Sequence, residues 1–151
     1  MIYFVDEDFR KLRALMSELV IRGYDVINIR DADAAYLELS NVNKEDVQLV
    51  IIDVMLAANS NQALSRYSRK ETDDYHKTGL LLLDDLADSN PRVFPRRAVY
   101  LSHASSDALL RKVSSSVRKH NVRFLRKKDY DTAYEFGEQV DEIIKDISQS
   151  R

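Results

Sequence analysis

The stretch Val47–Ile52, in which Gln48 is the only polar residue, has the length of a β-strand and ends at Asp53. A strand with apolar side chains on both faces is typical of a parallel sheet that is covered by helices on each side. Parallel strands need long crossover connections, which are usually helices. This run therefore restricts the chain to strands and helices that alternate around a central sheet.

Four further apolar runs of strand length precede or follow this one, and a helical pattern comes after each. They are Ile2–Val5, Tyr24–Ile29, Ala98–Leu101 and Val122–Leu125. Five strand-then-helix units predict an α/β fold with helices on both faces of a parallel sheet. We expect one domain over residues 1–151, a flavodoxin-like (βα)5 three-layer sandwich with strand order 2-1-3-4-5.

The helices are predicted from apolar residues that recur at steps of three and four. The first has Phe9, Leu12, Met16 and Leu19 on its inner face and closes at Gly23, and the second carries Ala35, Leu37 and Leu39. The third opens at Gly79. The expected N-caps are Asp31 for the second helix, Ser105 or Ser106 for the fourth and Asp131 for the last.

One segment interrupts this regular order. Residues 57–78, between the third strand and the third helix, are rich in Ser, Asn, Arg, Lys and Asp, and only Ala63, Leu64 and Tyr67 offer a helical face. Loops longer than about 12–15 residues in a compact domain tend to be functional or disordered. We predict a mobile inserted loop or short helix above the strand ends that contacts a partner; a passive surface excursion is the alternative.

Composition excludes several other kinds of protein. The chain has no cysteine, so disulfides, thiolate zinc sites and cysteine catalysis are excluded. Its three glycines cannot form a Walker A loop or a dinucleotide-binding fingerprint. Any phosphate must therefore be held by side chains, a metal ion and isolated backbone amides.

Neither a secretory signal nor a transmembrane segment is expected. Ile2–Val5 is too short for a signal, and the apolar run from Leu49 to Ala58 is broken by Asp53. We therefore expect a cytoplasmic protein with no membrane partner. The formal net charge of −2 gives no general attraction to nucleic acid.

Polar residues stand where the predicted strands end. Asp6 and Glu7 follow the first strand, Asp53 the third, Ser102 the fourth and Lys127 the fifth. In an open α/β sheet the binding crevice lies at these ends, so the predicted order gathers all five residues around one crevice. Three carboxylates repel one another unless a cation is present, and Mg²⁺ suits such oxygen ligands. A carboxylate there could attack phosphorus, with the ammonium and the hydroxyl balancing the phosphoryl charge.

Four segments at these strand ends resemble the signature segments of response-regulator receiver domains, in the same order. They are Val5-Asp6-Glu7-Asp8, Leu49-Val50-Ile51-Ile52-Asp53, Tyr100-Leu101-Ser102 and Phe124-Leu125-Arg126-Lys127. Gly79–Leu83 is also similar to the start of the family's third helix. The resemblance covers nearly the whole chain apart from the insertion. It implies a single receiver domain of the chemotaxis type, as used in two-component signalling.

The resemblance implies a role for each residue of the crevice. Asp53 would accept the phosphoryl group, and Asp6, Glu7, Asp53 and the backbone carbonyl of Met55 would hold Mg²⁺. Ser102 would be the hydroxyl that swings toward the phosphoryl group, Lys127 would pair with a phosphoryl oxygen, and Phe124 would turn inward as Ser102 moves. Packing in the core explains Phe124 equally well, and charge at a helix N-terminus explains Asp6 and Glu7.

The implied function is a phosphorylation-dependent signalling switch and not an enzyme, although the domain would assist its own phosphorylation and dephosphorylation. A histidine kinase or phosphotransfer protein would be the donor, and a downstream protein would recognise the changed surface. Nucleic acid is not an expected partner, because no reading module accompanies the basic residues Arg118, Lys119, Arg123, Arg126 and Lys128.

The chain departs from the family at three positions. Lys128 and Ala57 stand where the family usually has proline, and His103 stands where a small residue usually follows the switch hydroxyl. We expect His103 to control the access of water to the phosphoryl group, by shielding it or, alternatively, by donating a proton.

Two other functions remain open. A pseudo-receiver would have the fold and bind proteins without phosphorylation. An aspartyl-phosphate phosphohydrolase usually carries a second Asp two positions after its nucleophile, where this chain has Met55.

Overall fold

The computed structural model describes residues 1–57, 65–73, 75–103 and 106–150. The strands are β1 (Ile2–Val5), β2 (Val26–Ile29), β3 (Leu49–Ile52), β4 (Ala98–Ser102) and β5 (Arg123–Arg126). The helices are α1 (Phe9–Ile21), α2 (Ala32–Leu39), α3 (Thr78–Ser89), α4 (Asp107–His120) and α5 (Ala133–Gln149). Two short 3-10 helices, η1 (Lys44–Asp46) and η3 (Lys127–Asp129), precede β3 and follow β5.

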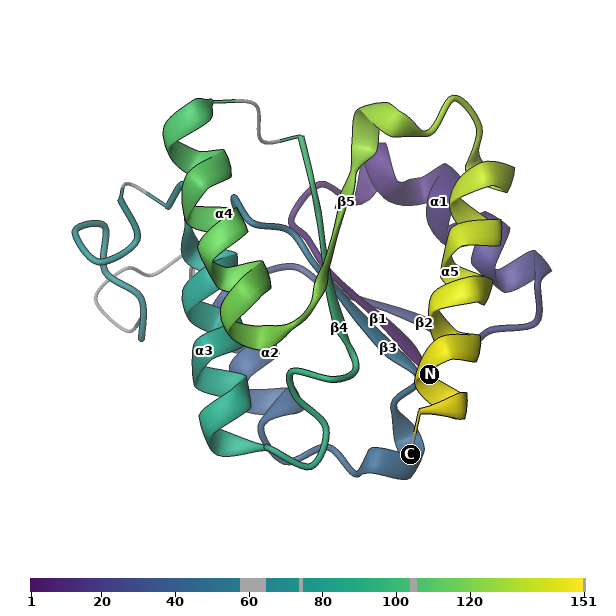
Figure 1. Cartoon of the computed structure of the whole chain (residues 1–151), viewed down its shortest axis with the longest axis horizontal. Helices are drawn as coiled ribbons and strands as arrows, with labels where there is room; N and C mark the ends of the chain where they lie inside the picture. The colour runs from purple at the N-terminus through teal and green to yellow at the C-terminus, as the bar shows by residue number, and fades with distance from the viewer. Residues whose placement is uncertain (58–64, 74, 104–105, 151) are drawn as a thin grey trace.

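All five strands are parallel and form one sheet in the order β2-β1-β3-β4-β5, which confirms the predicted topology. Helices α1 and α5 cover one face of the sheet, and α2, α3 and α4 cover the other (Figure 1). The carboxyl ends of β1 and β3 lie side by side, since Val5 pairs with Ile52. Asp6 and Asp53 therefore leave the sheet next to each other.

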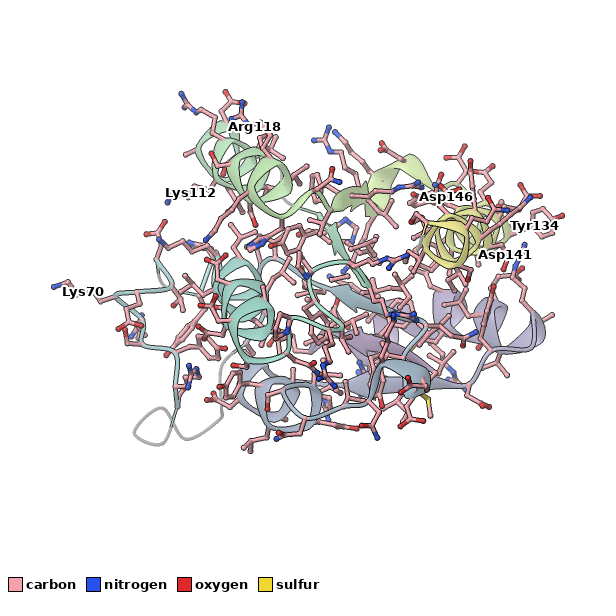
Figure 2. All side chains as sticks on the ribbon, turned by 60° about the horizontal axis from the view of Figure 1, so that its bottom comes forward. Lys70, Lys112, Arg118, Tyr134, Asp141 and Asp146 are labelled. Carbon is pink, nitrogen blue, oxygen red and sulfur yellow. The ribbon has the colours of Figure 1, made fainter. Side chains whose placement is uncertain are left out.

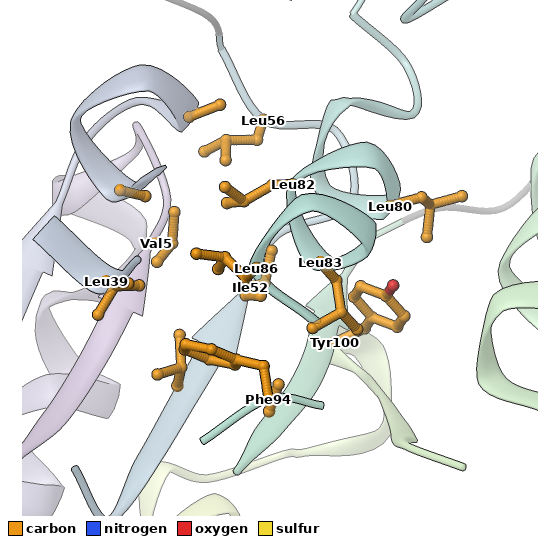
Figure 3. Close-up of a cluster of buried hydrophobic side chains, with 14 of the residues drawn as sticks. Val5, Leu39, Ile52, Leu56, Leu80, Leu82, Leu83, Leu86, Phe94 and Tyr100 are labelled. Carbon is orange, nitrogen blue, oxygen red and sulfur yellow. The ribbon is translucent and has the colours of Figure 1, made fainter. Parts of the chain in front are cut away.

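Alternate residues of the three central strands point into two separate cores. Val5, Ile52 and Tyr100 pack under α2, α3 and α4, together with Leu82 and Leu86 of α3 (Figure 3). The residues one position earlier, Phe4, Ile51 and Val99, pack under α1 and α5. This is the pattern that the apolar run before Asp53 predicts, because both faces of the sheet are covered.

Three strands begin later than predicted: β5 starts at Arg123 instead of Val122, and β2 and β3 each start two residues late. Val47 closes η1 through its amide, so β3 starts at Leu49. Tyr24 belongs to the turn after α1, where its amide donates to the Leu19 carbonyl at 3.1 Å, so β2 starts at Val26. Its hydroxyl binds Asp141 of α5 at 2.6 Å, which explains an aromatic residue at this position outside the strand.

The helix caps agree with the sequence in two of three cases. The side chains of Asp31 and Ser106 accept hydrogen bonds from the amides of Ala34 and Leu109; Ser105, the alternative to Ser106, lies outside the described residues. The cap of α5 is Thr132 and not Asp131, because the Thr132 hydroxyl accepts from the Glu135 amide at 3.2 Å.

Two residues predicted on inner helix faces are exposed. The side chains of Phe9 and Leu37 are 46% and 74% exposed, so both predictions were wrong. Phe9 is the first residue of α1, and Leu37 follows the buried Ala35 by two positions, which places it on the other side of a helix. No helix in the described part of the chain is long and apolar enough to cross a membrane.

The described part of the insertion packs against the domain. Tyr67 and Thr72 are buried, and the Tyr67 hydroxyl donates to Asp85 of α3 at 3.0 Å. The Ser65 hydroxyl and the Arg66 amide each bind Asp33 of α2 at 2.7 Å. Residues 65–73 and 75–77 contain no helix, and Ala63 and Leu64 lie outside the described residues. The predicted mobility of the insertion stays a prediction.

Candidate functional site

Asp6 lies in the crevice at the end of β1 and is only 3% exposed. Its Oδ1 accepts the Asp8 amide at 2.9 Å, and its Oδ2 accepts Lys127 Nζ at 2.9 Å. The Asn28 side chain donates to the carbonyls of Phe4 and Asp6, at 3.1 and 3.0 Å, and so ties the end of β1 to β2. The Asp6 carboxylate is therefore held by the Asp8 amide and by Lys127, while Asn28 fixes the Asp6 backbone carbonyl.

Lys127 reaches Asp6 from the first position of η3, directly after β5. Its side chain is 9% exposed and that of Asp6 is 4% exposed, so the two charges form a buried ion pair. Strands β3 and β4 lie between β1 and β5 in the sheet, so the pair spans the crevice at the ends of those strands. The predicted convergence of Asp6 and Lys127 is thus present, although the ammonium binds a carboxylate.

Asp53 follows β3 and lies largely buried beside this ion pair. Its amide donates to the Val5 carbonyl at 2.9 Å, and its Oδ1 accepts the Met55 amide at 3.2 Å. Ser102, the buried last residue of β4, lies near the same carboxylate, and its hydroxyl acts to lower the pKa of Asp53. Asp53, Asp6, Ser102 and Lys127 therefore meet, as the sequence predicts.

The electrostatics of the crevice show an excess of negative charge. Burial and the neighbouring Asp6 carboxylate raise the pKa of Asp53 to about 6, although Lys127, the Met55 amide and the Ser102 hydroxyl act in the opposite direction. Partial burial, Asp6 and Asp8 also raise the pKa of Glu7. The single ammonium does not compensate the carboxylates fully, and a further cation would stabilise their ionised forms.

The donor set fits a magnesium ion, but with fewer carboxylates than predicted. Among the described residues, no group of three or more Asp, Glu or His side chains comes close enough together to hold a metal. The expected cluster of Asp6, Glu7 and Asp53 is therefore not formed, and Glu7 is exposed on the loop after β1. Mg²⁺ is commonly held by one or two carboxylates and completes its shell with water and phosphate oxygens. Asp6 and Asp53 supply two such carboxylates, and the Met55 carbonyl is the further ligand that the resemblance implies.

The loop after Asp53 is fixed by burial on both sides of Met55. Val54 and Leu56 are buried in the core under α3, whereas the Met55 side chain points outward. The amide of Gly79 donates to the Val54 carbonyl at 2.9 Å. A Cβ atom at Gly79 would lie 2.1 Å from the Asp53 carbonyl oxygen, so only glycine allows α3 to approach the backbone of the candidate phosphoacceptor this closely.

The remaining two predicted residues lie at the rim of the crevice. Phe124 is half-buried and packs against the core under α2, α3 and α4. His103 is exposed, and its pKa is lowered by partial burial and by the nearby Lys127 and Lys11 cations. A lowered pKa disfavours the protonated imidazole that proton donation requires, so it favours the shielding role.

Sequence reasoning missed three residues that support the site. Asn28 fixes the end of β1, and its position in an edge strand carries no signal of that role. The hydroxyls of Tyr100 and Ser116 share a buried hydrogen bond of 2.6 Å, which joins β4 to α4 two residues before Ser102. In the sequence, the only indication of this contact is that a tyrosine stands inside an apolar strand.

Several solved structures have the same architecture as this chain. The chain is similar to a CheY-like response regulator receiver domain protein from Methanospirillum hungatei, with a TM-score of 0.69 and 15% identity over 99% of this chain and 97% of the other. The chain has the fold of a response-regulator receiver domain. No model of a known protein family matches the sequence, and no curated protein is similar to it.

Two further receiver structures agree over nearly their whole length. The receiver domain of NtrX from Brucella abortus has a TM-score of 0.65 and 18% identity over 100% of both chains. A response regulator from Thermotoga maritima has a TM-score of 0.63 and 20% identity over 95% of this chain and 96% of its own. The receiver architecture thus extends across the chain, including the residues around the insertion.

The raised pKa of Asp53 leads to a prediction about stability. In the folded protein the carboxylate binds its proton up to about pH 6 instead of about 3.8, so ionisation opposes folding as the pH rises through this range. At pH 7.5 in EDTA, Asp53→Asn should raise the free energy of unfolding by about 1–2 kcal/mol, a value reduced for partial solvent screening. Urea unfolding at pH 7.5 and at pH 4.0 tests this. The gain in the free energy of unfolding should shrink at pH 4.0. An equal gain at both pH values would contradict a raised pKa of Asp53.

Proposed function

We propose that the chain is a phosphorylation-dependent switch of a two-component or phosphorelay system, with Asp53 as the phosphoacceptor. The observation that supports this best is the convergence of Asp53, Asp6, Ser102 and Lys127 at the carboxyl end of one parallel sheet. These residues come from four different strand ends, and each is partly or fully buried. A carboxylate in such a setting has the surroundings that a nucleophile toward phosphorus needs.

In the proposed reaction an oxygen of the Asp53 carboxylate attacks the phosphorus of the donor. The bond from phosphorus to the donor's leaving atom breaks, and an acyl phosphate forms on Asp53. Lys127 leaves Asp6 and pairs with a phosphoryl oxygen, and the Ser102 hydroxyl donates to another. Asp6, Asp53 and the Met55 carbonyl would hold Mg²⁺, with Glu7 nearby on the loop after β1, and the ion would supply positive charge for the phosphoryl oxygens.

The consequence of phosphorylation would be a change of surface rather than turnover of a metabolite. Ser102 lies near Asp53 before the reaction, and its movement toward the phosphoryl group would free space next to β4 that the half-buried Phe124 can occupy. We infer that the domain is not an enzyme for an external substrate. A histidine kinase or phosphotransfer protein would be the donor, and a downstream protein would bind the altered face.

Incubation of the full chain with a small acyl phosphate and Mg²⁺, followed by intact mass measurement, tests this function. We expect an adduct of one phosphoryl group that requires Mg²⁺. Rapid release of phosphate without an adduct would indicate an aspartyl-phosphate phosphohydrolase instead. Neither adduct nor release would indicate a pseudo-receiver, which the absence of a three-carboxylate group among the described residues would then help to explain.

His103→Ala is expected to shorten the lifetime of the phosphorylated protein about threefold. His103 follows Ser102 directly and lines a cleft with Met55, so its imidazole lies on a route that water can take to the phosphoryl group. Removal of the ring would lower the barrier to hydrolysis by less than about 1 kcal/mol, which is typical of the loss of one exposed side chain. The decay of the adduct over time is the measurement, with His120→Ala as the control on the far end of α4. An unchanged or longer lifetime would contradict the shielding role.

A further inference from the structure

Positive charge is concentrated on helix α4, although the chain as a whole has a negative net charge. The chain has a formal net charge of −2, whereas α4 combines Asp107 with four exposed cations. These are Arg111, Lys112, Arg118 and Lys119. Figure 2 shows Lys112 and Arg118 on the same side of the molecule as Lys70 of the insertion. Lys70, Lys112 and Arg118 thus lie on one side of the molecule, where α4 supplies most of the positive charge.

An apolar-floored groove runs along this surface between α3 and α4. It has a volume of about 310 Å³ and two apolar lining residues, Leu80 and Leu81. Three lysines, one acidic residue and two serines complete the lining: Lys77, Lys112, Lys119, Asp84, Ser115 and Ser116. Lys112, Ser115 and Lys119 follow one another at steps of three and four, which places them on one face of α4. We call this feature the α3–α4 groove.

Residues of the insertion line a second cleft, which continues from the α3–α4 groove toward Asp53. A cleft of about 480 Å³ shares Lys112 with the groove and continues past Asp73 and His76 to Met55 and His103. Lys112 binds Asp73 of the insertion at 3.2 Å, and Lys119 binds Asp84 of α3 at 3.2 Å. Both lysines are exposed, and such ion pairs contribute about 0–1 kcal/mol. Their ammonium groups can therefore move to carboxylates of another molecule at small cost.

We propose that the α3–α4 groove, with the described part of the insertion as its second wall, is a docking site for an acidic segment of a partner protein. Apolar side chains of that segment lie on Leu80 and Leu81, and its carboxylates pair with Lys77, Lys112 and Lys119. Charge complementarity selects an acidic partner, and the leucine floor selects a peptide. A nucleic-acid backbone has few apolar groups for that floor, and none of the described residues that line the groove is an aromatic on which bases could stack.

Two labelled synthetic peptides test the proposal on the unphosphorylated full chain. Both carry leucines at the same helical positions, and glutamates surround them in one peptide and lysines in the other. We expect the acidic peptide to bind about tenfold more tightly at low salt and the difference to shrink as salt is added. Backbone amide shifts in two-dimensional NMR spectra should change mainly in α3 and α4. Because phosphorylation is not involved, failure here leaves the proposed function of Asp53 untouched.

Charge reversals on the groove give the matched variants. Lys112→Glu and Ser115→Glu should each weaken the acidic peptide about fivefold, and Lys145→Glu on the exposed side of α5 should have less than about a twofold effect. Ser115→Glu breaks no ion pair, so it separates a docking effect from a loss of the Lys112–Asp73 contact. Thermal unfolding confirms that each variant is folded.

Several results would overturn the docking site. Equal binding of the two peptides, or an equal effect of Lys112→Glu and Lys145→Glu, would show that the groove does not select acidic segments. Shift changes centred on the exposed apolar residues Phe9, Val20 and Ile21 of α1 would place the site elsewhere. A single-stranded DNA oligonucleotide that binds as tightly as the acidic peptide, and depends on Lys112, would indicate nucleic acid as the ligand.

Discussion

Gly79→Ala is expected to lower the free energy of unfolding by about 3 kcal/mol, because the new methyl group has no room. Its Cβ would lie 2.1 Å from the Asp53 carbonyl oxygen and 2.9 Å from Val54 Cα, and both are backbone atoms. The backbone there is held by the Gly79 amide bound to Val54 and by the Asp53 amide bound to Val5. Helix propensity alone would favour alanine by about 1 kcal/mol, so the two effects have opposite signs.

Urea unfolding of the wild type, Gly79→Ala and Gly137→Ala measures this effect with a matched control. Gly137 is also helical, but a Cβ there would meet side-chain atoms of Arg22 and Glu18 and no backbone atom among its three nearest contacts. We expect a loss of about 1 kcal/mol for Gly137→Ala. The same displacement should slow phosphorylation of Gly79→Ala, since the backbone that carries Asp53 must shift. A Gly79→Ala protein as stable as the wild type would show that α3 does not constrain Asp53.

Lys127→Ala is expected to destabilise the protein by about 3 kcal/mol at pH 7.5 in the absence of Mg²⁺. Its partner Asp6 is nearly fully buried, and removal of one member of a buried ion pair leaves an uncompensated charge. Lys127 also lowers the pKa of Asp53, so that pKa should rise further in the variant. The loss should therefore be smaller at pH 5, where Asp53 is largely protonated.

Two further variants make this result specific. Lys128→Ala, at the exposed neighbouring position, should change stability by less than about 0.5 kcal/mol. Combining Asp6→Asn with Lys127→Met should recover much of the loss, because neither charge then remains buried. If Lys127→Ala and Lys128→Ala had equal effects, Lys127 would be an ordinary surface residue and the proposed role in phosphoryl binding would lose its basis.

The strand order was predictable because it depends on features that repeat along the chain. Five apolar runs with helical patterns between them leave few topologies, and the apolar run before Asp53 requires cover on both faces of the sheet. The boundaries were less predictable, since they depend on single contacts between distant elements. Tyr24 looks like a strand residue, but its hydroxyl binds Asp141, more than a hundred positions later in the sequence.

The composition of the site followed from the fold, but its internal pairing did not. Asp6, Asp53, Ser102 and Lys127 converge because parallel strands end at the same edge of the sheet. The sequence cannot show that Lys127 binds Asp6, or that Glu7 stands apart from a group with Asp6 and Asp53, because these depend on side-chain directions. The packing of the insertion was hidden for a similar reason: Tyr67 and Thr72 are buried within a polar segment.

Location of the phosphoryl group by tandem mass spectrometry tests the central claim most directly. The chain is treated with a small acyl phosphate and Mg²⁺, digested at low temperature, and the modified peptide is fragmented, with Asp53→Asn as the control. We expect the phosphoryl group on Asp53 and no labelling of Asp53→Asn. A phosphoryl group on another residue, or undiminished labelling of Asp53→Asn, would contradict the assignment of Asp53 as the phosphoacceptor.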